Sequence, residues 1–174
     1  MLSAYRTAAA ARHQQGIPPL PLDPQQTAAV CALLEAPPAG EEAFLISLLG
    51  DRVSPGVDPA AKVKAEWLGA IAHGTKHSPL INSPGAIRLL GTMFGGYNVP
   101  FLVRELDGAH ALLAADALAR TVLVFDNFSV VAAMAKAGNA VAAKLIQRWA
   151  AAEWFTSRAE IEPVLRGHVE HDRL

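Results

Sequence analysis

The chain has one cysteine, few aromatic residues and no long apolar run. The single cysteine, Cys31, excludes a disulfide framework within the chain and a zinc site built from cysteines, and we expect it as a buried residue of a helix. The longest apolar stretch, residues 121–135, carries Asp126 and Asn127 in its middle. It falls short of the roughly 18 residues that a membrane span needs. We therefore expect a folded protein of the cytoplasm, without a membrane anchor.

The chain also has no excess of charge of one sign, and it has no alternation of apolar and polar residues of the kind seen in strands. The net charge is −1, which gives no bulk attraction to nucleic acid or to an anionic membrane. No stretch alternates apolar and polar residues with enrichment in β-branched types, so no strand is predicted. The hydrophobic fraction is 52% although aromatic residues make up only 6%. Much of that fraction is alanine, and this composition favours helices.

Helix boundaries are marked clearly along the chain. Asp23-Pro24, Asp58-Pro59 and Ser83-Pro84 each place a capping side chain before a proline at the first helical position. Glycines mark the stops and corners between helices. The predicted helices span residues 2–15, 24–36, 41–50, 59–73, 84–94, 100–107, 109–127, 129–137, 140–155 and 157–166. Residues 1–166 are thus predicted as one helical domain, and residues 167–174 as a frayed polar tail.

Helix pairs recur at a regular spacing. The connections are short, which makes successive helices antiparallel neighbours. Predicted pairs begin near residues 24, 59, 100 and 140. This spacing of roughly 35–41 residues lies in the range of two-helix solenoid repeats. We therefore predict an all-α stack of about eight to ten helices.

The most informative stretch is residues 86–103. Its apolar helical pattern stops at Gly95-Gly96, and a second apolar run restarts at Pro100. Paired glycines end a helix because they enter the left-handed region without a Cβ penalty. Proline is favoured at the start of the next helix. We expect a helix, a tight corner and a second helix, with a positive φ at Gly95 or Gly96.

The glycine corner, residues Gly95, Gly96, Tyr97 and Asn98, is the candidate interaction site. A corner exposes backbone amides together with two polar-tipped side chains, so one interpretation is contact with a partner or ligand. The other interpretation is structural: Asn98 caps the helix that begins at residues 99–100, while Tyr97 packs over the corner. The sequence leaves both interpretations open.

Other polar residues are weaker candidates. His73 and His77 have a spacing that allows two side chains to share a metal on one helix face, but Gly74 between them favours two solvated loop histidines. Asp126 follows an apolar run that would raise its pKa and suit acid–base chemistry. The alternative is that Asp126 or Asn127 caps the following helix. We predict no catalytic, metal-binding or cofactor-binding residue.

Several motifs, in order, resemble the N-terminal helical domain of bacterial aconitase B. The resemblance runs from residue 1 to about residue 158. The motifs are PPAGEE at residues 37–42, VSPGVD at 53–58, GTMFGGYN at 91–98, FDNF at 125–128, AKAGN at 135–139 and WAAAEWF at 149–155. In that family a GTM-x-GGYN corner lies between two helices.

The resemblance implies a HEAT-like, right-handed α-α superhelix associated with protein–protein recognition and homodimerisation. Aconitases use a [4Fe–4S] cluster held by three cysteine thiolates, which one cysteine cannot supply. The resemblance therefore implies a part without the aconitase active site and without a cofactor, since the cluster would lie in domains absent here. The predicted function is a non-catalytic interaction domain that binds a protein partner or forms a homodimer.

Two other functions stay open. The chain is alternatively a fragment of a full aconitate hydratase B, an enzyme of the tricarboxylic acid cycle that interconverts citrate and isocitrate through catalytic domains absent here. A second alternative is a regulatory RNA-binding element, and the balanced charge argues against strong RNA binding by this piece alone. Residues 161–174 do not resemble the family's entry into its next domain, which favours a natural stand-alone protein.

Overall fold

The computed structural model describes residues 1–121, 123–124 and 127–152, and every regular element within these ranges is helical. The elements are α1 (Leu2–Gln14), α2 (Pro24–Glu35), α3 (Glu42–Asp51), α4 (Pro59–Ala72), α5 (Ser83–Leu90), α6 (Val99–Arg104), the 3-10 turn η1 (Glu105–Asp107), α7 (Ala111–Leu118), α8 (Asn127–Lys136) and α9 (Ala140–Ala150). The all-α prediction is confirmed for these residues. In the same part of the chain, no helix has the length and apolar character needed to cross a membrane.

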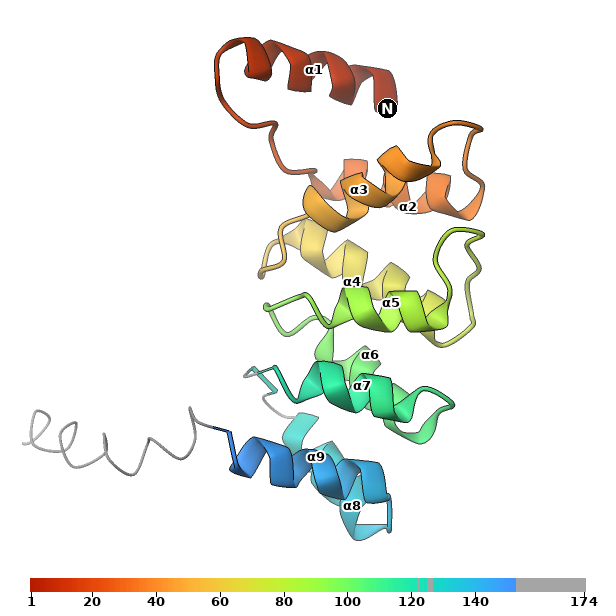
Figure 1. The fold of residues 1–174 in the computed structure, drawn as a ribbon, viewed down its shortest axis with the longest axis vertical. Coiled ribbons are helices and arrows are strands. Elements are labelled where there is room, and N and C mark those ends of the chain that lie inside the picture. Colours follow the sequence, from red (N-terminus) through yellow and green to blue (C-terminus); the bar gives the residue numbers. More distant parts are fainter. Residues whose placement is uncertain (122, 125–126, 153–174) are drawn as a thin grey trace, which may run out of the picture.

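The helices from α2 onward pack as pairs in two layers. The pairs are α2 with α3, α4 with α5, α6 with α7 and α8 with α9. Contacts between successive pairs join α2, α4, α6 and α8 in one layer, and α5, α7 and α9 in the other. Figure 1 shows these pairs following one another along the longest axis, with α1 at the N-terminal end. This arrangement is compatible with the HEAT-like superhelix that the resemblance implies.

Two predictions about the helices are wrong. The helix predicted over residues 109–127 is much shorter in the structure, where α7 ends at Leu118. Just beyond its end, the Thr121 hydroxyl donates to the Ala117 carbonyl at 3.2 Å. A side chain that donates a hydrogen bond to a helix carbonyl competes with the backbone amide that would bond to it in a longer helix. The fourth pair also begins at Asn127 rather than near residue 140. The helix predicted over residues 157–166 and the tail at 167–174 lie outside the described residues.

Side-chain capping explains the starts of four helices in the described part of the chain, α2, α4, α5 and α9. The Asp23 and Asp58 carboxylates accept hydrogen bonds from first-turn amides of α2 and α4, as predicted. The third predicted cap, Ser83, is wrong by one residue, because the Asn82 side chain caps α5. The Ser83 hydroxyl instead donates to the Ile71 carbonyl at 3.2 Å and so ties the start of α5 to α4. Adjacent polar residues before a proline are hard to rank from sequence alone.

The core lies between the helix layers and consists mainly of leucine, isoleucine, valine and alanine. Cys31 belongs to it, as the sequence predicted. Burial raises the pKa of the Cys31 thiol to about 12. The thiol therefore stays protonated near neutral pH and behaves as a small apolar group rather than as a reactive thiolate.

Lys64 in α4 is an almost fully buried cation, and it supplies a testable prediction. Burial lowers the pKa of its ammonium group, and the charge of Asp51 opposes this effect. We expect Lys64→Met to raise the Tm at pH 7 by about 2–4 °C, because an apolar side chain of similar length removes the cost of burying a charge. The gain should shrink as the pH rises toward 10, since the unfolded chain holds this proton more tightly than the folded one.

Thermal melts of Lys64→Met at pH 7 and at pH 10 measure this effect. Lys62→Met is the matched control, because Lys62 is an exposed lysine of the same helix. Its Nζ lies 3.9 Å from Oε1 of Glu66, which is also exposed. We expect the Lys62 variant to melt close to the parent protein. A lower Tm for Lys64→Met at pH 7 would show that the buried ammonium stabilises the fold.

Candidate functional site

The glycine corner lies where two loops of the stack meet. It belongs to the loop between α5 and α6, and the loop between α3 and α4 runs beside it on one edge of the molecule (Figure 1). The Phe94 amide donates to the Pro55 carbonyl at 2.8 Å, and the Tyr97 hydroxyl donates to the Val57 carbonyl at 3.1 Å. These hydrogen bonds join the two loops directly, although they are about forty residues apart in the sequence.

The two glycines of the corner are needed for different reasons. Gly96 has a φ of +88°, in the left-handed region, which confirms the predicted positive φ for one member of the pair. Gly95 is required for space. A Cβ atom added there would lie 2.0 Å from the carbonyl oxygen of Gly56 in the neighbouring loop. The close approach of the two backbones therefore depends on the missing side chain at Gly95.

Asn98 is fully buried and caps the helix that precedes it, not the one that follows. Its Nδ2 donates to the Leu90 carbonyl at 2.8 Å and to the Met93 carbonyl at 3.1 Å. The predicted cap on α6 is wrong, because the backbone of Asn98 is already helical and its side chain makes no hydrogen bond to an α6 amide. An N-cap needs an extended backbone to bring its side chain over the first turn. Its burial gives Asn98 a structural role and keeps it from direct contact with a partner.

Apolar side chains at this corner remain in contact with solvent. Tyr97 is half-buried against the core, whereas Val57 is 71% exposed and Phe94 is 69% exposed. We call Val57, Phe94 and Tyr97 the corner patch. Neither Val57 nor Phe94 is among the site residues predicted from the sequence. The sequence does contain a sign of both. Val57 in VSPGVD and Phe94 in TMFGG are apolar residues next to turn residues, where no helix face is available to bury them.

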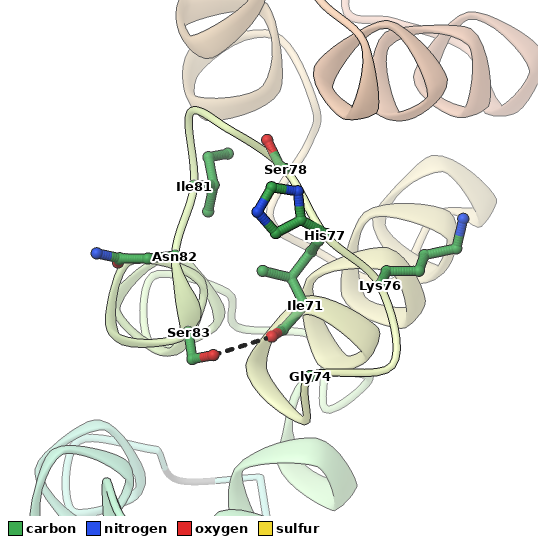
Figure 2. A pocket seen from close by; sticks show the side chains of 8 residues that line it. All are labelled: Ile71, Gly74, Lys76, His77, Ser78, Ile81, Asn82 and Ser83. Atoms are coloured by element: carbon green, nitrogen blue, oxygen red, sulfur yellow. Dashed lines mark hydrogen bonds between the residues drawn. The ribbon is translucent and has the colours of Figure 1, made fainter.

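A pocket of about 260 Å³ lies at the opposite edge, between the end of α4 and the start of α5 (Figure 2). Most of its polar groups are already engaged within the protein. The Ser78 hydroxyl donates to the Leu34 carbonyl at 2.6 Å, Ser83 bonds to Ile71, and Asn82 caps α5. The pocket is therefore explained by the way the α4–α5 loop is held in place.

His73 and His77 are both exposed and follow the end of α4, as predicted for two solvated loop histidines around Gly74. Gly74 has a φ of +75° just after α4. Nδ1 of His73 lies 3.2 Å from Oε1 of the buried Glu105, which links α4 to η1, while His77 lines the pocket. Nowhere in residues 1–121, 123–124 and 127–152 do three or more metal-ligating side chains gather. The other candidate, Asp126, lies outside the described residues.

These observations define the class of protein: a domain of stacked helix pairs, with exposed apolar side chains on two connecting loops that are hydrogen-bonded to each other. Residues 4–155 match the family described as the Aconitate B N-terminal domain. The chain belongs to this family, which confirms the resemblance seen in its motifs.

Related sequences agree with this assignment. The chain is 55% identical to aconitate hydratase B of Escherichia coli K12 over 159 residues, which cover 91% of this chain and 18% of the relative. It is 51% identical to aconitate hydratase B of Pseudomonas aeruginosa over 92% of this chain and 19% of that protein. It is 41% identical to aconitate hydratase B of Helicobacter pylori J99 over 97% of this chain and 20% of that protein. The chain thus spans about a fifth of the length of the curated relatives it matches.

The iron–sulfur cluster that the resemblance associates with aconitases does not fit the residues of this chain. Such a cluster is held by several cysteine thiolates. This chain has Cys31 alone, and that thiol is packed in the core with a raised pKa. We therefore assign no step of aconitase chemistry to residues of this chain.

Proposed function

We propose that this chain is a non-catalytic interaction domain that docks through the corner patch onto the catalytic part of an aconitate hydratase B. The observation that carries the proposal is the exposure of Val57 and Phe94 on a well-anchored pair of loops. Exposed apolar side chains on loops that are bonded to each other favour association, because they lose water contact when a partner covers them. Membership of the family supports this choice of partner, since about four-fifths of the E. coli relative lies outside the matched segment.

The way the patch is built supports docking. The two loops are cross-linked by hydrogen bonds from Phe94 and Tyr97, and the close contact of Gly95 with Gly56 leaves little room for movement. A surface that is already ordered loses less conformational entropy on binding. The net charge of −1 supports a protein partner over RNA, because RNA binding draws much of its affinity from positive charge.

Substitution of the patch tests the proposal. The partner is the E. coli relative from which the matched segment has been deleted, shown to be folded by circular dichroism. We expect the chain to bind this partner, and the Val57→Ser/Phe94→Ser double variant to bind more than about tenfold more weakly. Burial of each apolar side chain contributes about 1.5–3 kcal/mol, and a factor of ten corresponds to about 1.4 kcal/mol. Isothermal titration calorimetry measures the change.

Leu112→Ser is the matched control, because Leu112 in α7 is also 71% exposed but lies outside the corner patch. We expect it to bind as the parent chain does. Equal affinity of the double variant and the control would contradict docking through this patch. If sedimentation shows instead a dimer of the chain alone that the double variant abolishes, the patch serves homodimerisation. Specific RNA binding by the chain alone, at physiological salt, would favour the regulatory alternative.

A further inference from the structure

A cavity of about 270 Å³ lies between α1, the linker of residues 15–23 and the first turn of α2. Figure 1 shows α1 at the N-terminal end of the molecule, joined to α2 by this linker. α1 is not among the closely packed helix pairs of the described residues, and its buried residue is Tyr5. It is fastened to the start of α3 by Arg6, whose guanidinium donates two hydrogen bonds to the Glu41 carboxylate. The protein therefore leaves space beside a helix that is itself held in place.

The linker that forms the second wall of the cavity is also held in place. The Leu22 amide donates to the Arg52 carbonyl at 2.7 Å, and the Tyr5 hydroxyl donates to the Leu20 carbonyl at 3.3 Å. Prolines at positions 18, 19 and 21 restrict the backbone of the linker further. Both walls are thus formed before anything enters the cavity, as is usual for sites that bind small molecules.

The lining of the cavity is mostly apolar, but it carries two charges of opposite sign. The apolar part comes from alanines of α1 such as Ala8, from Tyr5, and from linker prolines together with Leu20, which is 59% exposed. The charged part consists of Arg12 in α1 and Asp23 at the N-cap of α2. Within the described residues these two side chains have other hydrogen-bond partners and do not pair with each other.

Both charged side chains keep groups that are free to bind a ligand. Nε of Arg12 donates to the Pro18 carbonyl at 2.7 Å, and its two terminal nitrogens have no partner in the described part of the chain. Oδ1 of Asp23 accepts a hydrogen bond from the Gln26 amide at 2.7 Å, while Oδ2 has no partner there. The terminal nitrogens of an arginine bind a carboxylate well, and a carboxylate oxygen binds an ammonium group.

We propose that this cavity binds a free apolar α-amino acid. The ligand carboxylate accepts hydrogen bonds from the terminal nitrogens of Arg12, and its ammonium group donates to Oδ2 of Asp23. The apolar side chain lies against Ala8, Tyr5 and Leu20 and takes them out of contact with water.

Size and charge favour a single amino acid over a larger ligand. The volume of about 270 Å³ lies just below the usual range of about 300–1,000 Å³ for ligand pockets. A terminal residue of a peptide offers one of the two charges, and an internal residue offers neither, so the free amino acid matches both charged groups of the lining. The proposal does not depend on the corner patch or on its partner.

An amide-resolved NMR titration of the full chain with L-leucine tests this proposal. We expect saturable shift changes in residues 4–12 and 19–26, with a Kd of about 1 mM or lower. Isocaproate lacks the ammonium group and isoamylamine lacks the carboxylate, so each should bind at least about tenfold more weakly than L-leucine. The absence of saturable changes around the cavity, or equal binding of either analogue, would overturn the proposal.

Variants of the lining separate the two charges from the shape of the cavity. Asp23→Asn removes a charge but keeps a good N-cap residue, and Arg12→Gln removes the other charge. Each should weaken L-leucine binding at least about tenfold. Ala8→Leu places a larger side chain in the cavity and should abolish binding, while circular dichroism shows that the chain stays folded. The matched control is Arg88→Gln, an exposed arginine of α5 outside the cavity, which should bind as the parent does. Parental affinity in the Asp23, Arg12 and Ala8 variants would overturn the proposal.

Discussion

The Gly95→Ala variant is expected to lose about 3 kcal/mol or more of unfolding free energy, because overpacking against a fixed backbone cannot be relieved by a rotamer change. The added Cβ would lie 2.0 Å from the oxygen and 2.4 Å from the carbon of the Gly56 carbonyl. The two loops would have to separate. This would break the hydrogen bond from Phe94 to Pro55 and move the Tyr97 hydroxyl away from its acceptor. Chemical denaturation of the purified variant measures the loss.

Gly50→Ala is the matched control for this substitution. Gly50 lies in α3, and a Cβ added there meets nothing within 4 Å. Because alanine is the better helix former, we expect Gly50→Ala to stabilise the protein by up to about 1 kcal/mol. Similar unfolding free energies for the two variants would show that the loops part easily, and would contradict a rigid corner.

Asn98→Ala is expected to be the second most damaging substitution, with a loss of about 2–3 kcal/mol. It removes two buried hydrogen bonds at once and leaves the Leu90 and Met93 carbonyls without their side-chain donor. Asn82→Ala at the opposite end of α5 removes an ordinary N-cap and should cost only about 1 kcal/mol. Denaturant unfolding of both variants gives the comparison.

Asn98→Asp tests the direction of these hydrogen bonds. A carboxylate has nearly the same shape but no donor for the two carbonyls, and it would be an unpaired charge in the core. We expect it to be at least as destabilising as Asn98→Ala. A stable Asn98→Asp protein at pH 7 would mean that the side chain does not cap α5 through its amide hydrogens.

Features set by neighbouring residues in the chain could be predicted from the sequence. The caps at Asp23 and Asp58 and the positive φ of Gly96 depend on an Asp-Pro pair or a glycine pair, which act within one turn. The buried Cys31 follows from the helical spacing of its apolar neighbours. The all-α fold follows from many such local signals that agree with one another.

Features that depend on distant residues could not be predicted in this way. Gly95 is explained by Gly56, and the exposure of Phe94 depends on how its backbone is bound to Pro55. The Asn98 side chain bonds to the end of α5 rather than to α6, and the backbone of Asn98 is helical. No local sequence pattern predicts this conformation. The corner was therefore found from the sequence, but the residues that project from it were not.

A hydrogen-exchange footprint tests docking through the corner patch on the surface itself. The chain is measured alone and with an excess of the E. coli relative that lacks the matched segment. We expect slower exchange of backbone amides in residues 53–58 and 91–98 when the partner is present, with little change in α7 around Leu112. Protection confined to other surfaces, or the absence of any protection at a concentration that saturates binding, would contradict it.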